Sequence, residues 1–197
     1  MARIDFYWDA ASPYTYLAAT QIGALVDRHK ATLNWKPFLL GATFQATGNK
    51  MPAAIPAKGK YLFKDVKLWA AYYGVPLNWP QVFPVNSLLA QRAACAIGDE
   101  RASDWALAVM RAYWVNGKDI GRTEVVETVL REHGFDAPAV LEAVQTPAVK
   151  QQLKSNTEEA VARGAFGAPT FFIDDQMFWG NDRLPLMDVC LSGKLAA

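Results

Sequence analysis

The stretch "DAASPYTYLAAT", residues 9–20, lies where an extended segment gives way to a helical one. The preceding segment "RIDFYWD", residues 3–9, is rich in aromatic and aliphatic side chains, which is typical of a strand. Ser12 is a good helix N-cap, and Pro13 suits the first helical position. Ser12 and Thr15 place hydroxyls at the two positions where a Cys-x-x-Cys redox motif carries thiols. The stretch predicts a strand-to-helix junction that has no sulfur of its own.

A helix, a second strand and a loop are expected after this junction. The helix after Ser12 has an apolar stripe, formed by Leu17, Ile22, Leu25 and Val26. A second strand is expected at 32–40, "TLNWKPFLL". Residues 41–56 are rich in Gly, Ala, Pro and Asn, so we expect a loop that leaves the sheet there.

A helical region follows that loop. Its helices are expected at 63–73, 87–97, 103–115, 123–133 and 146–164. Most begin at an N-cap candidate or end at a glycine, and the last has an apolar face of Val149, Leu153, Ala160 and Val161.

The end of the chain returns to short strands. Residues 170–173 and 176–179 are expected to form a hairpin through a two-residue turn, and Asp182 is expected to cap a final helix that ends at Gly193. The order β-α-β, helices, β-β-α predicts an α/β fold, a thioredoxin-like sheet interrupted by an all-helical insertion. We assign residues 1–40 and 165–197 to the sheet domain and 41–164 to the insertion.

Composition narrows the partners. The 197 residues are 52% hydrophobic, enough for a substantial core, and 20 basic residues balance 19 acidic ones. This balance disfavours nucleic acid or a membrane surface as a partner and favours small molecules. No apolar run approaches the length of a membrane span, and the N-terminus leads into a strand rather than a signal peptide, so we expect a cytoplasmic protein.

The cysteines and histidines are few and isolated. Cys95 and Cys190 lie in apolar helical patterns, so buried free thiols are expected rather than a disulfide. His29 and His133 each fall near the C-terminal end of an expected helix, where a cation is favourable. No metal site is expected.

Several segments carry a family resemblance. They are Ser12-Pro13-Tyr14-Thr15, Gly167-Ala168-Pro169-Thr170 and Phe178-Trp179-Gly180-Asn181-Asp182-Arg183, together with "PFLLGATFQATGN" and "FPVNSLLAQRAA". In their order along the chain they resemble the DsbA-related, kappa-class glutathione transferase group, and within it the bacterial 2-hydroxychromene-2-carboxylate isomerases. The resemblance covers essentially the whole chain and implies glutathione as cofactor and a homodimer.

The resemblance gives Ser12 a role that helix physics supports. A helix N-terminus stabilises an anion, so Ser12 could hold the thiolate of bound glutathione and lower its pKa by ~2 units. The structural alternative is a plain N-cap. The family also implies that Pro169 is cis and that the Ala168 backbone pairs with the cysteinyl part of glutathione. The alternative there is an ordinary loop proline.

Two further sets follow from the resemblance. The γ-glutamyl end of glutathione would meet Asp182 and Arg183 beside Trp179, Gly180 and Asn181; alternatively, Asp182 is only an N-cap. The second substrate, an aromatic acid, would lie between sheet and insertion. Its candidate residues are Tyr14, Phe44, Gln45, Asn49, Phe83, Pro84 and Asn86. The isomerases carry a lysine where this chain has neutral Gln45, so Lys50, Lys58 and Lys60 are candidates to meet the substrate carboxylate.

The implied reaction is isomerisation in aromatic hydrocarbon degradation. The glutathione thiolate would add to the ring-opened form of 2-hydroxychromene-2-carboxylate, the former double bond would rotate, and elimination would give trans-o-hydroxybenzylidenepyruvate. Two alternatives stay open. One is a kappa-like transferase that releases a glutathione conjugate, and the other is a non-catalytic, thiol-free binding module.

Overall fold

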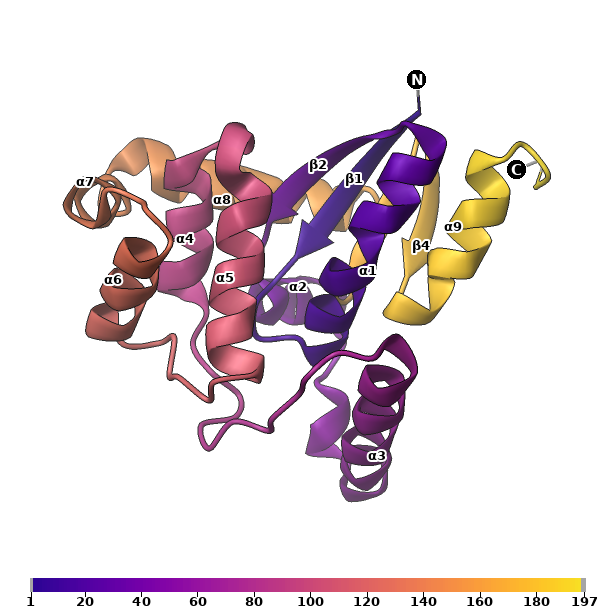
Figure 1. Ribbon diagram of the computed structural model, residues 1–197, viewed down its shortest axis with the longest axis horizontal. Helices are drawn as coiled ribbons and strands as arrows, with labels where there is room; N and C mark the ends of the chain where they lie inside the picture. The colour runs from indigo at the N-terminus through magenta and orange to yellow at the C-terminus, as the bar shows by residue number, and fades with distance from the viewer. Residues whose placement is uncertain (1, 196–197) are drawn as a thin grey trace.

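The structure, a computed structural model, describes residues 2–195 and centres on a four-stranded sheet of order β2-β1-β3-β4 (Figure 1). Its strands are β1 (Arg3–Trp8), β2 (Thr32–Pro37), β3 (Thr170–Ile173) and β4 (Gln176–Trp179). β1 pairs in parallel with β2 and antiparallel with β3, and β3 and β4 form the expected hairpin. The α/β fold with a thioredoxin-like sheet is therefore confirmed.

Helices cover both faces of this sheet. α1 (Pro13–His29) and α9 (Leu184–Leu191) lie side by side in front of it in Figure 1, and α8 (Pro147–Ala162) lies behind it. The other helices are α2 (Leu40–Thr47), α3 (Pro56–Tyr73), α4 (Leu88–Ile97), α5 (Ala102–Trp114), α6 (Thr123–Glu132) and α7 (Ala137–Ala143), with short 3-10 turns at Pro52–Ala54, Asp99–Arg101 and Asn181–Arg183. None of the helices within residues 2–195 is long and apolar enough to cross a membrane.

The segment expected to be a loop after the second strand is partly helical, so that expectation was wrong. β2 ends at Pro37 and α2 begins at Leu40. Two threonines bond back along the helix, from Thr43 Oγ1 to the Leu39 carbonyl at 3.0 Å and from Thr47 Oγ1 to the Thr43 carbonyl at 2.8 Å. Gly48, with φ at +70°, then ends α2 in the left-handed conformation that suits glycine.

Other element boundaries also differ from the sequence expectation. α3 begins at Pro56, seven residues before the expected start at 63, and α7 was not anticipated. The buried face of α8 includes Asn156 and Thr157 with Leu153 and Ala160, because both polar side chains find partners: Asn156 donates to the Pro37 carbonyl at 3.0 Å, and the Thr157 hydroxyl donates to the Leu153 carbonyl at 2.8 Å.

One continuous apolar core joins the sheet to the helical segment. Phe6 of β1, Leu17 of α1 and Trp105 of α5 belong to the same buried cluster. A second cluster on the opposite side of the sheet packs Tyr7 and Phe172 against Ala160 of α8. The boundary between a sheet domain and an insertion stays a prediction, since the core runs across it.

The cysteines are free but only half-buried, which corrects the expectation of full burial. Burial nevertheless raises the pKa of the Cys95 thiol to about 12, so that thiol stays protonated at neutral pH. His29 closes α1 and His133 follows α6, as expected. Among residues 2–195, no group of three His, Cys, Asp or Glu side chains could hold a metal ion.

Candidate active site

Ser12 caps α1 and also contacts the loop before β3. Its Oγ accepts a hydrogen bond from the Thr15 N–H at 3.2 Å, so the expected N-cap is confirmed. The same hydroxyl donates to the Ala168 carbonyl at 3.1 Å. Ser12 is 4% exposed, and its hydroxyl is directed at a backbone carbonyl of the loop before β3. A plain N-cap would need only the first of these contacts.

The loop that meets Ser12 presents backbone groups toward it. The Ala168–Pro169 peptide is cis, which confirms the expectation. The Pro169 carbonyl accepts from the Gly180 N–H at 3.0 Å, which fixes this loop against the end of β4. Ala168 is half-buried, and no hydrogen bond to its N–H is found among residues 2–195. The residue whose carbonyl contacts Ser12 therefore also offers an unpaired N–H.

Asp9, which sequence reasoning missed, holds the segment leading to Ser12. Its Oδ1 accepts from the Ala11 N–H at 2.9 Å, and its Oδ2 accepts from the Leu40 N–H at 2.8 Å. Its own carbonyl accepts from the Ser12 N–H at 3.1 Å. Burial raises the pKa of Asp9, while these backbone hydrogen bonds and one from Ser87 oppose the rise. One buried carboxyl group thus ties the Ser12 turn to the start of α2.

A second polar side chain supports the same turn. Gln91 of α4 is fully buried and donates to the carbonyls of Trp8 at 2.7 Å and Phe38 at 3.2 Å. Trp114 of α5 donates to the Ala10 carbonyl at 2.8 Å. The helical segment therefore fixes the backbone that ends β1 and leads to Ser12.

The hydroxyl groups of Tyr14 and Thr15 have different surroundings. The Tyr14 hydroxyl donates to Asp65 Oδ2 of α3 at 2.6 Å, and burial together with that carboxylate raises the pKa of Tyr14. Thr15 is fully buried and its hydroxyl has no partner within the described residues. Both hydroxyls are buried, but only that of Ser12 contacts the loop before β3, so Ser12 is the one of the pair that can take part in the site.

The residues predicted to meet the γ-glutamyl end of glutathione include a short 3-10 turn, Asn181–Arg183. Asp182 lies within that turn and does not cap α9, whose N-cap is Arg183, so the capping expectation was wrong. The half-exposed carboxylate of Asp182 pairs with Arg183 at 3.2 Å. Asn181 is 2% exposed, and its carbonyl accepts from the Tyr73 hydroxyl at 3.2 Å. A negative and a positive group therefore stand together at the surface.

Glycines allow close packing between this turn and the loop before β3. A side chain at Gly167 would meet Trp179 Nε1 at 2.6 Å, inside contact distance. Gly180 has φ at +107°, which disfavours other residues, and its α-carbon lies close to the Asp182 carboxylate. Trp179 is 46% exposed and packs against Phe166, with ring centroids 4.8 Å apart. The predicted glutathione residues are thus joined to one another, and the hydrogen bond from Ser12 to the Ala168 carbonyl connects Ser12 to them.

The predicted substrate residues divide into two groups. Asn49 donates to the Phe166 carbonyl at 2.8 Å, next to the Ala168 loop. Phe83 packs against Trp114, which bonds to the segment before Ser12. The remaining side chains show no contact with Ser12: Phe44 is half-buried, Gln45, Pro84 and Asn86 are exposed, and Asn86 accepts from the Leu88 N–H at 3.1 Å. These assignments stay predictions.

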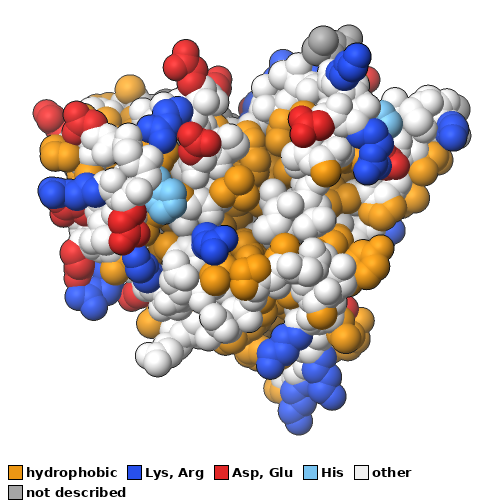
Figure 2. Space-filling view, in the orientation of Figure 1, with side chains coloured by type: hydrophobic (Ala, Val, Ile, Leu, Met, Phe, Trp, Pro, Cys, Tyr) orange, Lys and Arg blue, Asp and Glu red, His pale blue; other side chains and the backbone are white. Residues whose placement is uncertain are grey.

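The lysines proposed to meet a substrate carboxylate lie at the surface. Lys50, Lys58 and Lys60 are all exposed, and Figure 2 shows basic side chains gathered at the tip of α3. Two large hollows, of about 540 and 560 Å³, occur elsewhere on the molecule, and neither includes Ser12 among its lining residues. The candidate site at Ser12 is therefore identified by its hydrogen bonds and not by the volume of a pocket.

These residues fit glutathione by three observations. A hydroxyl stands at the N-terminus of α1, where an anion is stabilised. An unpaired backbone N–H at Ala168 can pair with a peptide in the manner of an added strand. Asp182 and Arg183 offer charges for an α-amino and an α-carboxylate group.

Comparisons with known proteins agree with the family resemblance of the sequence. A family model described as a DSBA-like thioredoxin domain matches residues 3–191. A 2-hydroxychromene-2-carboxylate isomerase from Sphingobium xenophagum is 34% identical over 187 residues, which covers 94% of this chain and 95% of that relative. Glutathione S-transferase kappa 1 from Homo sapiens is 29% identical over 206 residues and covers 97% and 91% of the two chains.

A solved structure gives the corresponding result for the fold. A structure of a 2-hydroxychromene-2-carboxylate isomerase matches with a TM-score of 0.89 at 28% sequence identity. The match covers 97% of this chain and 95% of that one.

Proposed function

Since this chain belongs to the DsbA-like thioredoxin family, we propose that it uses glutathione to isomerise an aromatic enone acid. The chain is an enzyme, an isomerase similar to the 2-hydroxychromene-2-carboxylate isomerases. The proposed substrate is 2-hydroxychromene-2-carboxylate or a close relative, and the proposed product is trans-o-hydroxybenzylidenepyruvate. The single observation that carries the proposal is Ser12, a helix-capping hydroxyl that also contacts the carbonyl of Ala168.

The sulfur would have to come from glutathione, because no thiol of the protein stands at this position. Cys95 lies on α4 and Cys190 on α9, away from the N-terminus of α1. On binding, the Ser12 hydroxyl would turn from the Ala168 carbonyl to the glutathione sulfur. It would exchange a neutral hydrogen bond for a charge-assisted one, which is roughly twice as strong. This exchange favours the thiolate over the thiol and lowers the thiol pKa.

The proposed reaction consumes no glutathione. The thiolate forms a carbon–sulfur bond with the conjugated carbon, and the displaced π electrons move to the carbonyl oxygen. Rotation about the carbon–carbon bond, now single, changes its geometry. The electrons then return, the carbon–sulfur bond breaks, and the thiolate is regenerated. Ser12 stabilises the departing sulfur anion in that last step.

A transferase is the second candidate, supported by the kappa-class relatives. Both reactions begin with the same thiolate and differ in whether the adduct is released. The deciding experiment incubates the enzyme with glutathione and 2-hydroxychromene-2-carboxylate and follows both products by chromatography. Isomer formed at constant total glutathione supports the proposal, and an accumulating conjugate rejects it. Absence of glutathione binding at millimolar concentration would leave only a binding module.

The homodimer implied by the family belongs to the same proposal. Exposed apolar side chains occur on α3 (Tyr61, Leu68 and Tyr72) and on α9 (Leu186 and Val189), and these offer surfaces for a second copy. Analytical ultracentrifugation tests this directly, since a monomer at micromolar concentration would reject the dimer. A cytoplasmic location and a role in aromatic hydrocarbon catabolism are proposed with the isomerase.

A further inference from the structure

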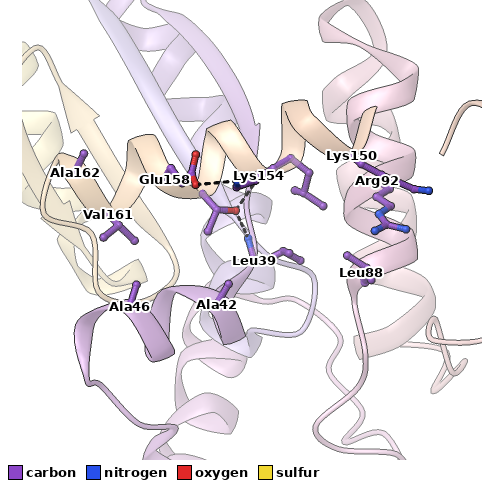
Figure 3. A pocket seen from close by; sticks show the side chains of 12 residues that line it. Leu39, Ala42, Ala46, Leu88, Arg92, Lys150, Lys154, Glu158, Val161 and Ala162 are labelled. Atoms are coloured by element: carbon purple, nitrogen blue, oxygen red, sulfur yellow. Dashed lines mark hydrogen bonds and ion pairs between the residues drawn. The ribbon is translucent and has the colours of Figure 1, made fainter. Parts of the chain in front are cut away.

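A groove of about 540 Å³ lies between α2, α4 and α8, away from Ser12 (Figure 3). Its wall is mainly aliphatic. It is formed by Leu39, Ala42 and Ala46 at α2, Leu88 at α4, and Leu153 and Val161 on α8. No aromatic side chain takes part in the lining, which favours an alkyl ligand over a flat aromatic one. The groove is therefore a second candidate binding site.

One end of this groove is cationic. Arg92 and Lys150 stand together at the α4 end in Figure 3, whereas Ala46, Val161 and Ala162 form the opposite end. The Nε of Arg92 is buried and has no hydrogen-bond partner within the described residues. Buried polar groups normally have partners, so this one points to a ligand that supplies an acceptor.

Charge on the groove favours an anion. Arg92 and Lys150 form no ion pair among residues 2–195. Lys154, nearer the middle, pairs with Glu158 at 3.6 Å and so contributes little net charge. The uncompensated positive charge is thus concentrated at one end of an apolar channel.

The groove does not coincide with the predicted substrate region. Ala42 and Ala46, four residues apart, share one face of α2 and point into the groove. Phe44 lies on the opposite side of the helix because successive residues turn by about 100°, whereas Gln45 lies at the flank, about 60° from Ala42. Neither residue lines the groove.

We propose that this groove binds an alkyl carboxylate, with its head group at Arg92 and Lys150 and its alkyl chain along α8 toward Val161. From Lys150 to Val161 the helix spans eleven residues, about 16 Å, which suits an extended alkyl chain. The carboxylate supplies the acceptor that Arg92 Nε lacks, and the aliphatic wall covers the tail. The proposal is independent of the isomerase activity.

Calorimetry with decanoate tests this site. We expect one saturable decanoate site per chain and weaker binding of decanol, which has the tail without the charge. Arg92→Met should weaken decanoate binding about tenfold or more, because a charged hydrogen bond is lost. Ala46→Trp should abolish binding by filling the apolar end. Lys67→Met, a change at an exposed lysine of α3, should leave binding unchanged.

Two further measurements separate a ligand site from a structural role. Arg92→Met should leave the melting temperature of the ligand-free protein unchanged or raise it, because Arg92 Nε has no partner to lose. Glutathione binding should be unaffected in every variant. Equal affinity for decanol and decanoate, or full decanoate binding by Arg92→Met, would overturn the proposal. The proposal would also be overturned if the wild type bound no decanoate and Ala46→Trp lost self-association. That result would assign the groove to a second copy of the chain.

Discussion

The Ser12 hydroxyl lies 3.1 Å from the carbonyl oxygen of Ala168, although the two residues are 156 positions apart in the chain. This contact joins the first helix to the loop before β3, the two segments that would flank the sulfur of a bound peptide. Because Ser12 also caps α1, its oxygen accepts from the helix while its proton is donated to the Ala168 carbonyl. The hydroxyl proton is the group that a thiolate would compete for.

Replacing Ser12 tests the role of that proton. Ser12→Ala should reduce kcat/KM about 100-fold or more, as expected for loss of a hydrogen bond to a reacting anion. It should lower the free energy of unfolding by only about 1 kcal/mol, through loss of the cap. Thr146→Ala is the matched control, since Thr146 caps α8 by accepting from the Val149 N–H at 3.3 Å. Thr146→Ala should lower the free energy of unfolding by a similar amount and leave the activity unchanged. If the two variants were equally active, Ser12 would be only a structural cap.

Asp9 is expected to be a positioning residue for Ser12. Asp9→Ala leaves the N–H groups of Ala11 and Leu40 without their acceptor, so the free energy of unfolding should fall by about 2 kcal/mol or more. Asp9→Asn keeps one acceptor oxygen and should lose less of both stability and turnover. Urea unfolding and steady-state kinetics measure the two effects. Asp9→Ala with normal stability would show that the carboxyl group does not hold the turn.

The same residue makes stability depend on pH in a defined direction. Burial raises the pKa of Asp9 above its ordinary value of 3.8, so the folded protein keeps a proton that the unfolded chain releases. The contribution of Asp9 to the free energy of unfolding therefore falls as the pH rises from 3.8, its ordinary pKa, through its pKa in the folded protein. The same contribution is regained as the pH is lowered through that range. The wild type should gain stability relative to Asp9→Asn between neutral pH and about pH 4. A constant difference would contradict the shift.

Asp182 should contribute to glutathione affinity. Removing its charge in Asp182→Asn should weaken glutathione binding about tenfold, because the ligand ammonium loses a charge-assisted partner. Asp175→Asn is the matched control, a surface aspartate in the turn between β3 and β4. Isothermal titration with glutathione compares the three proteins. The assignment of the γ-glutamyl end to Asp182 fails if both variants bind as the wild type does.

Gly167 is expected not to tolerate a side chain. In Gly167→Ala the new methyl group would lie 2.6 Å from Trp179 Nε1, so the indole must move. Overpacking of this kind costs about 1–3 kcal/mol, and the half-exposed Trp179 should absorb part of it by swinging toward solvent. Glutathione affinity should fall with it. Adding Trp179→Leu should restore stability; failure of this rescue would place the clash elsewhere.

The sequence predicted the elements that carry strong local signals. The cap at Ser12 and the hairpin strands β3 and β4 were found because N-cap chemistry and a two-residue turn are both local. α2 was missed because Gly41, its threonines and the Asn and Pro residues that follow it favour a loop on propensity, while the start of the helix is held by distant partners: the Leu39 N–H donates to Thr157 and the Leu40 N–H to Asp9. Tertiary structure outweighed propensity there.

The site was predictable only in part, for a physical reason. Ser12 and Pro169 could be identified from motifs, but the hydrogen bond between Ser12 and Ala168 needs the folded chain. Asp9 begins the 9–20 stretch, and its position directly after a strand of apolar residues was the available signal. Its partner Leu40 is 31 residues away, a pairing that no local pattern encodes.

Titration of enzyme-bound glutathione, followed by the ultraviolet absorbance of its thiolate, decides whether Ser12 stabilises the sulfur anion. In the wild type, the thiol pKa should fall by ~2 units from its value in free glutathione. In Ser12→Ala, at saturating glutathione, the pKa should return most of the way to the free value. The same bound pKa in both proteins would contradict the role given to Ser12.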